Sequence, residues 1–202
     1  MQKNQTASPN EAVTARKKLL GDIYDFLELF ASAAAIILLV FCFLTRLSIV
    51  EGGSMQHTLE GNDKLLISGL FYTPSESDIV VIQSPKINDG KAIVKRVIAT
   101  AGQTVYIDEQ GTVSVYNPDG SGGVLNEEDG SLGYTVHYSY SASRPRNPYG
   151  AMQVTVPEGK VFVLGDHRNN SHDSRAFGCV DVCSILGKVY MRILPLSSLR
   201  GF

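Results

Sequence analysis

The chain has 202 residues, a formal net charge of -2, three cysteines and no tryptophan. This length suits one domain with a small annex, and three cysteines exclude a small fold held together by disulfides. A near-neutral chain also lacks the basic surface of nucleic-acid-binding proteins, so no nucleic-acid partner is expected.

The first predicted element is an apolar helix near the N-terminus. The chain's mean hydropathy is close to zero, which is slightly high for a soluble protein, and residues 29–45 carry no charge between Glu28 and Arg46. This run is at the lower edge of the about 17–25 residues that span a bilayer. A buried core helix would keep a polar face, and a cleavable secretory signal would end in a small-x-small site. We therefore predict one transmembrane anchor over 28–46.

Basic residues flank the predicted anchor unevenly. Arg16, Lys17 and Lys18 precede it, whereas only Arg46 follows it directly. The positive-inside rule then predicts a cytoplasmic segment over 1–27 and an extracytoplasmic domain over 47–202. The expected location is the cell membrane, crossed once, with the lipid bilayer as a partner.

Short apolar stretches, alternating or rich in β-branched residues, follow the anchor. Turn residues separate them, as at Asn88-Asp89-Gly90. These stretches predict a mainly β domain of barrel or sandwich type. Residues 117–150 are rich in Gly, Ser and Pro, so we predict a small inserted subdomain there. The predicted strands are 64–68, 78–83, 92–100, 104–107, 113–116, 134–140, 153–156, 160–164 and 185–193.

A serine directly after the anchor is the first candidate for chemistry. Ser54 follows Gly52 and Gly53, which let another backbone approach closely. The serine can therefore offer both its hydroxyl and its backbone N–H to a bound carbonyl. Taken alone, however, a Gly-Gly-Ser stretch is more typical of a flexible linker.

A lysine within a predicted strand is the second candidate. Lys95 shares one face of that strand with Ile93 and Val97. Burial in such an apolar row lowers the pKa of an ammonium toward the range of a general base. The alternative is an edge strand, where an exposed lysine protects against aggregation.

The polar segment over 163–178 is the third candidate. It contains carboxylates, arginines, histidines and serines between two predicted strands. A solvated surface turn has the same composition, but this density also suits an ordered polar network around a catalytic pair.

Together these segments resemble the type I signal peptidases, peptidase family S26, in their single-anchor Gram-positive-like form. The resemblance runs from the anchor to near the end of the chain, and four sequence boxes occur in the family's order. The boxes are Ser54-Met55 with Thr58-Leu59, Asp78-Ile79-Val80-Val81, Lys95-Arg96-Val97-Ile98, and Gly165-Asp166 with Arg168, Asn170-Ser171, Asp173-Ser174-Arg175 and Phe177-Gly178.

The resemblance implies a membrane-bound serine endopeptidase with Ser54 as nucleophile and Lys95 as general base. Its substrates would be secretory preproteins, cut after small-x-small sites, and no cofactor or metal is implied. It also assigns supporting and substrate-binding positions. Ser171 would hydrogen-bond the lysine, Asp173 and Arg175 would form an ion pair, Asp166 would hold Arg96, and Met55, Ile93 and Val94 would line the substrate cleft.

The chain departs from the family pattern at four positions. His57 replaces a proline, His167 stands where asparagine is usual, and Ala99 where glycine is common. Gly52 occupies a position where some members carry a serine that assists the oxyanion hole.

Three other interpretations remain open at this point. His167 and His172, with Cys179 and Cys183, could form a metal site, although their spacing matches no standard zinc pattern. His172 and Asp173 could belong to a Ser-His-Asp triad, which geometry rather than order defines. The third is a non-catalytic, membrane-tethered β-domain that binds peptides.

Overall fold

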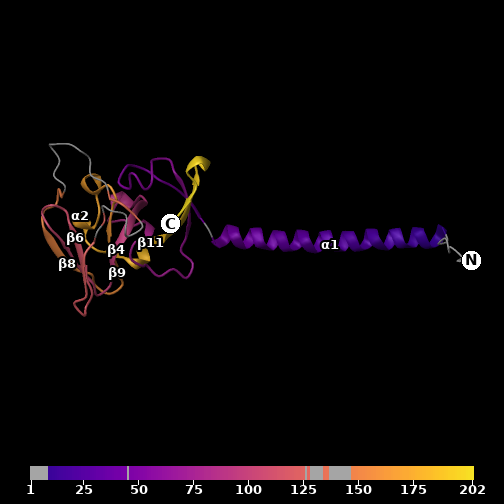
Figure 1. The fold of residues 1–202 in the computed structure, drawn as a ribbon, viewed down its shortest axis with the longest axis horizontal. Helices are drawn as coiled ribbons and strands as arrows, with labels where there is room; N and C mark the ends of the chain where they lie inside the picture. Colours follow the sequence, from indigo (N-terminus) through magenta and orange to yellow (C-terminus); the bar gives the residue numbers. More distant parts are fainter. Residues whose placement is uncertain (1–8, 45, 126, 128–133, 137–146) are drawn as a thin grey trace, which may run out of the picture. The chain divides into compact units, whose positions relative to one another are not determined.

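The computed structural model describes residues 9–44, 46–125, 127, 134–136 and 147–202. Along the N-terminal helix, side chains are described over 17–39. The chain divides into two compact units, Met1–Leu44 and Thr45–Phe202 (Figure 1).

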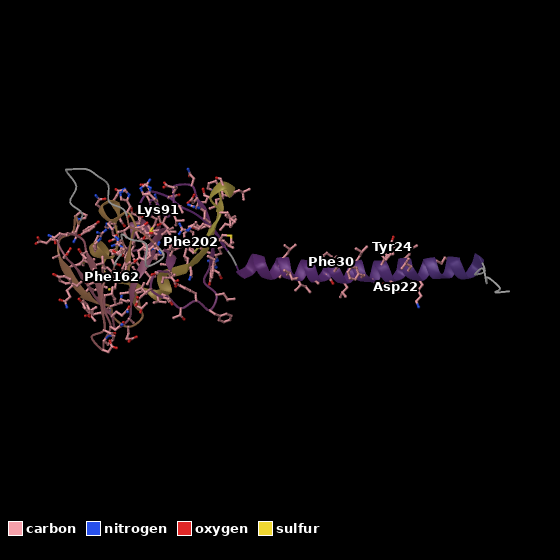
Figure 2. All side chains as sticks on the ribbon, viewed as in Figure 1. Asp22, Tyr24, Phe30, Lys91, Phe162 and Phe202 are labelled. Carbon is pink, nitrogen blue, oxygen red and sulfur yellow. The ribbon has the colours of Figure 1, made fainter. Side chains whose placement is uncertain are left out.

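The first unit contains a single helix, α1 (Pro9–Leu44). Its apolar side chains project outward, as Figure 2 shows for Phe30, which is 64% exposed. Among the residues whose side chains are described, no helix combines the length and apolarity of a membrane span. Residues 40–45 of the predicted anchor are not among the residues whose side chains are described.

The second unit is built from two antiparallel sheets. The larger has the strand order β1-β2-β11-β3-β4-β9-β10, with β12 paired to β11, and the smaller has the order β7-β6-β5-β8. The strands are β1 (Arg46–Ile49), β2 (Lys64–Ser68), β3 (Ile79–Ile82), β4 (Ile93–Thr100), β5 (Thr104–Ile107), β6 (Val113–Tyr116), β7 (Gly122–Val124), β8 (Met152–Thr155), β9 (Lys160–Leu164), β10 (Val180–Asp181), β11 (Ile185–Leu194) and β12 (Arg200–Gly201). The short helices are η1 (Asn88–Gly90), η2 (Arg168–Asn170), α2 (Ser174–Phe177), η3 (Val182–Ser184) and η4 (Leu196–Ser198).

The prediction of a mainly β domain is confirmed, with differences at individual strands. Strands β1, β7, β10 and β12 were not predicted, because such short segments carry no readable period and are defined by their pairing partners. The predicted strand over 134–140 is not present over 134–136, and 137–140 lie outside the described residues. Tyr134 and Val136 are both buried, which imitates the alternation of a strand. They lie in a loop, where the N–H of Val136 donates to the carbonyl of Glu127.

The smaller sheet lies in the sequence between β4 and β9, which are neighbours in the larger sheet. It starts at Thr104 and ends at Thr155, so it extends beyond the insertion predicted over 117–150. The predicted segment contains only β7 of this sheet among the described residues.

Strand β4 is an interior strand of the larger sheet. It pairs with β3 along one side and, from Arg96 onward, with β9 along the other. The interpretation of Lys95 as an exposed edge lysine is wrong, because this side chain is 3% exposed.

The larger sheet contains one contact in which two backbones touch. A Cβ atom added to Gly187 on β11 would lie 2.6 Å from the carbonyl atoms of Ser68 and 2.8 Å from the nitrogen of Gly69. Neither Gly69 nor Gly187 has a positive φ, so only the lack of space for a Cβ atom requires glycine at these positions.

Replacing Gly187 with alanine should destabilise the domain, because the obstructing atoms are backbone and cannot turn away. We expect Gly187→Ala to lower the free energy of unfolding by about 1–3 kcal/mol, the usual range for overpacking. Urea unfolding measures this change. Gly61→Ala is the matched control, since an added Cβ there would meet nothing closer than 4.0 Å. Equal stability of the two variants would contradict the packing argument.

Candidate active site

Ser54 lies in a compact turn that packs on the core. The N–H of Leu59 donates to the carbonyl of Met55 at 2.8 Å, and both side chains are buried in the same apolar cluster as Val94. The segment is therefore anchored by its own hydrophobic residues, and the flexible-linker interpretation is wrong.

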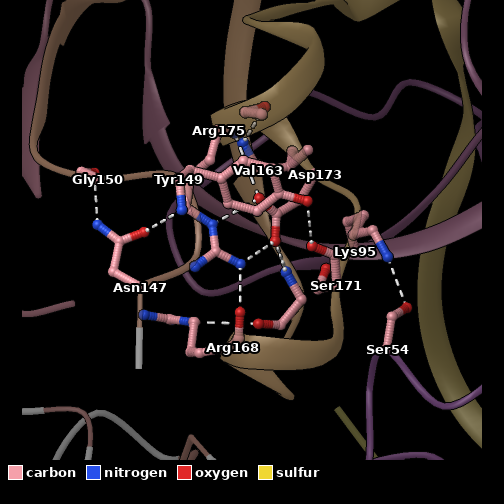
Figure 3. A network of polar contacts seen from close by, with 12 residues as sticks. Ser54, Lys95, Asn147, Tyr149, Gly150, Val163, Arg168, Ser171, Asp173 and Arg175 are labelled. Carbon is pink, nitrogen blue, oxygen red and sulfur yellow. Dashed lines mark hydrogen bonds and ion pairs between the residues drawn. The ribbon is translucent and has the colours of Figure 1, made fainter. Parts of the chain in front are cut away.

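The Ser54 hydroxyl meets the amine of Lys95 (Figure 3). The distance between Oγ and Nζ is 2.5 Å, within hydrogen-bonding range, although the two residues are far apart in the sequence. The turn supplies the hydroxyl and β4 supplies the amine. The structure thus brings together the two side chains that the sequence singled out as nucleophile and base.

Burial lowers the pKa of Lys95 to about 8, because the apolar surroundings disfavour the charged ammonium. The nearby carboxylates of Asp173 and Asp166 raise this pKa, and the guanidinium of Arg175 lowers it. The amine is therefore neutral in a substantial fraction of molecules near neutral to mildly alkaline pH, which a base requires.

Asp166 ties β4 to the serine-bearing turn. Arg96, next to Lys95, donates to its two carboxylate oxygens at 2.8 and 2.6 Å. The Thr58 hydroxyl donates to the same carboxylate at 2.6 Å. Because Arg96 and Thr58 both bind one buried carboxylate, the strand and the turn are held together.

Asp173 organises the loop that follows β9. Arg175 donates to both of its carboxylate oxygens at 2.8 Å, and the N–H of Gly165 donates at 3.1 Å. Burial raises the pKa of Asp173, but the contacts with Arg175, the Ser171 hydroxyl and the Gly165 N–H together hold this pKa below its usual value. The carboxylate therefore stays ionised beside the lysine.

Gly165 is the point where this loop meets the serine turn. A Cβ there would lie 2.2 Å from the Ser171 hydroxyl and 2.5 Å from the carbonyl oxygen of Ser54. Only a residue without a side chain fits between them.

Ser171 is buried beside the pair but is not bonded to the amine. Its hydroxyl faces the Asp173 carboxylate and helps to lower the pKa of that group (Figure 3). No hydrogen bond from this hydroxyl to Lys95 is present in the described part of the chain. This differs from the resemblance-based expectation, because the side chain is turned toward Asp173.

The three residues expected to line a cleft do not share one surface. Met55 is 2% exposed and packs with Val94 in the core cluster beneath the serine turn. Ile93 is partly exposed and packs with a different cluster, which includes Val97. Their separation follows from strand geometry, since successive side chains point to opposite faces.

Contacts that the sequence did not predict hold the polar loop from outside. Arg168, 1% exposed, forms a two-pronged ion pair with the buried Glu127. The hydroxyl of Tyr149 donates to the carbonyl of Ser171 at 3.0 Å, and its ring lies under the Arg175 guanidinium (Figure 3). Glu127 and Tyr149 are distant in sequence from the loop and belong to no motif, so only the fold reveals their role.

The other candidate groups are not assembled at this site. The His172 ring is exposed and packs edge-on against Phe177, while Asp173 binds Arg175. Cys179 and Cys183 are both free. Among the described residues, no group of three or more His, Cys, Asp or Glu side chains is placed to hold a metal.

Comparisons with known proteins agree on one family. Residues 23–194 match the family described as signal peptidase, peptidase S26. A probable signal peptidase I-1 from Synechocystis sp. is 30% identical over 184 residues, covering 87% of this chain and 84% of that protein. Signal peptidase IB from Staphylococcus aureus is 28% identical over 195 residues, covering 89% and 93%.

A signal peptidase I crystal structure from Enterococcus faecalis is also similar, with 28% identity and a TM-score of 0.43. It covers 58% of this chain and 97% of that one. The family match over most of the chain shows that this protein belongs to the signal peptidases of family S26 and is a serine endopeptidase that removes signal peptides.

Proposed function

We propose that the protein cleaves signal peptides with a Ser54–Lys95 dyad. The observation that carries this proposal is the 2.5 Å contact between the Ser54 hydroxyl and a buried amine. A serine hydroxyl is a weak nucleophile until an adjacent base takes its proton. Lys95 supplies the amine that is hydrogen-bonded to Ser54.

In the first half of the reaction, neutral Lys95 accepts the proton of the Ser54 hydroxyl. The oxygen attacks the scissile carbonyl carbon, and Lys95 then donates the proton to the leaving amine as the C–N bond breaks. This leaves an acyl-enzyme on Ser54. In the second half, Lys95 takes a proton from water, whose oxygen attacks the ester carbon. Lys95 then returns this proton to the Ser54 oxygen as the ester C–O bond breaks, which releases the signal peptide and restores both free Ser54 and neutral Lys95.

The backbone N–H of Ser54 is the proposed donor to the oxyanion. A donor that already points at the position of developing charge stabilises the tetrahedral intermediate without reorganisation. Ser171, Asp173, Arg175, Asp166 and Arg96 are proposed as supporting residues, because their contacts position the amine and the serine turn.

The substrate is proposed to bind as an extended strand beside the first half of β4. Among the described residues, β9 pairs with β4 only from Arg96 onward, so Ile93 and Val94 have a strand partner on one side only. An extended peptide adds to such a free edge through main-chain hydrogen bonds, and alternate side chains then enter pockets. Small residues at the first and third positions before the cut are proposed for this arrangement, in which Ile93 and Val94 contact the substrate through their main chain and Met55 supports the site from beneath the serine turn.

The apolar part of α1 is proposed to anchor the enzyme in the cell membrane. Residues 29–45 carry no charge, and Arg16, Lys17 and Lys18 precede them, which favours a cytoplasmic N-terminus and an extracytoplasmic catalytic domain.

Removing either member of the dyad should abolish cleavage. We expect Ser54→Ala and Lys95→Met each to lower kcat/KM for a preprotein by about a thousandfold or more, because nucleophile and base act as a unit. Lys91→Met is the matched control: Lys91 is exposed and precedes the same strand (Figure 2), so its loss should change little. Fragment masses from the same assay locate the cut.

Three results would contradict this proposal. Cleavage retained in Lys95→Met excludes lysine as the base. Loss in His172→Ala together with retention in Lys95→Met favours a histidine triad. Cuts after large residues at the first and third positions exclude the small-x-small preference.

The pH dependence of cleavage should report the lysine base. The base must be neutral, so kcat/KM should rise with pH and reach half its plateau near pH 8, where burial holds the pKa of Lys95. The Asp173 carboxylate raises that pKa. We therefore expect Asp173→Asn to move the midpoint to lower pH in a pH–rate measurement.

Asp181→Asn is the control for this shift, because Asp181 pairs with Lys160 on the exposed edge of the sheet. Its midpoint should equal that of the unmodified enzyme. A midpoint near 10.4, the value of free lysine, would show that burial does not tune the base.

Membrane attachment should depend on the apolar run. We expect the full chain to remain in the membrane pellet after alkaline carbonate extraction. This treatment disrupts electrostatic contacts at the membrane surface, whereas a spanning helix is held by its apolar side chains. Placing two arginines in the run, at Ile37 and Leu38, should release it, since charges near the centre of a span are costly. Replacing Lys17 and Lys18 with glutamine is the control and should leave the chain in the pellet. Release of the unmodified chain would contradict the anchor.

A further inference from the structure

His167 contacts the peptide unit that carries the serine N–H. Its ring nitrogen Nδ1 lies 3.1 Å from the carbonyl oxygen of Gly53, and its backbone N–H donates to the carbonyl of Ser54 at 3.0 Å. A carbonyl oxygen only accepts, so Nδ1 carries a proton in this hydrogen bond. The residue is 8% exposed, so water competes little for the contact.

The Gly53–Ser54 peptide unit is rigid. Partial double-bond character keeps its C=O and N–H groups in one plane, pointing in opposite directions. A hydrogen bond that fixes the direction of the Gly53 carbonyl therefore also fixes the direction of the Ser54 N–H.

The turn itself restrains this peptide weakly. Gly52, at a φ of 83°, and Gly53 have no side chains to limit rotation. Within the turn, the Gly53 carbonyl accepts only a long bond, 3.3 Å from the N–H of Gln56. The shorter contact comes from His167, on the loop after β9.

We propose that His167 is a positioning residue that aims the Ser54 N–H at the oxyanion. It acts through the Gly53 carbonyl and touches no reacting atom. The inference rests on the proposed function, because that function makes the Ser54 N–H a donor to the oxyanion. It assigns to the polar loop a second task besides holding Asp173 near Lys95.

Three variants distinguish the effect of the hydrogen-bond donor of His167 from the effect of the size of its side chain. His167→Asn keeps a donor, because its amide nitrogen is as many bonds from the backbone as Nδ1. His167→Leu puts carbon at that place, and His167→Asp puts there a carboxylate oxygen that repels the carbonyl. Asn and Asp have nearly the same shape, so their comparison remains valid even if the leucine variant folds poorly.

The first readout is steady-state cleavage of a preprotein. We expect His167→Leu and His167→Asp to lower kcat about tenfold to a hundredfold with KM little changed, which is less than the loss of an oxyanion donor itself. His167→Asn should stay within about threefold of the unmodified enzyme. In His167→Leu and His167→Asn, which add no charge, the midpoint of the pH–rate profile should not move, because Lys95 and its charged neighbours are untouched.

The second readout is inhibition by a substrate-like peptide aldehyde, which forms a tetrahedral adduct with an active-site serine. Its affinity should fall in the variants in proportion to kcat/KM, since both depend on the oxyanion site. Affinity for the same peptide ending in an alcohol, which forms no adduct, should not change. A merely structural role would weaken both inhibitors or shift the pH profile.

Matched controls keep the outcomes distinct. His172→Leu changes the exposed histidine of the same loop and should leave both readouts unchanged. Full activity in His167→Asp, or equal losses in His167→Asn and His167→Asp, would overturn the positioning role while leaving the dyad intact. Activity that survives Ser54→Ala would instead overturn the proposed function and this inference with it.

Discussion

The burial of one lysine amine determines how the proposed active site is built. Lys95 lies on an interior strand, is 3% exposed and bonds a serine that comes from a turn before β2. Transfer of an ammonium into such surroundings is costly, and the cost appears as a pKa lowered to about 8. The free energy for keeping the amine there comes from the apolar clusters on either side of the sheet, which pack whether or not the amine is charged.

The charged groups around this amine are paired with one another. Arg96 binds Asp166 and Arg175 binds Asp173, so each carboxylate is neutralised by an arginine rather than by the lysine. If either carboxylate were unpaired, its charge would favour the ammonium form and raise the pKa of Lys95. The contacts of Asp166 with Arg96 and Thr58 also fasten the serine turn and the polar loop to β4. Electrostatic tuning and positioning are therefore properties of one set of contacts.

Much of this site could be predicted from sequence because its parts are local. Ser54 after two glycines, Lys95 within an apolar row and the polar loop after β9 are each contiguous patterns. The pairing of Arg168 with Glu127 could not be predicted, because the two residues are far apart in the sequence and no sequence pattern relates their positions. The orientation of Ser171 toward Asp173 was also missed, since a rotamer depends on neighbours that only packing supplies.

Sequence patterns predict the mainly β character of the domain, the order of its motifs and the candidate serine and lysine. These features depend on side-chain period and residue type, which are read along the chain. Only the folded chain shows that β4 is interior and that residues 51–59 form a packed turn. It also shows that His167 meets the Gly53 carbonyl. Such contacts join residues far apart in sequence, and they exist only when strand pairing and close packing have fixed the distance between segments.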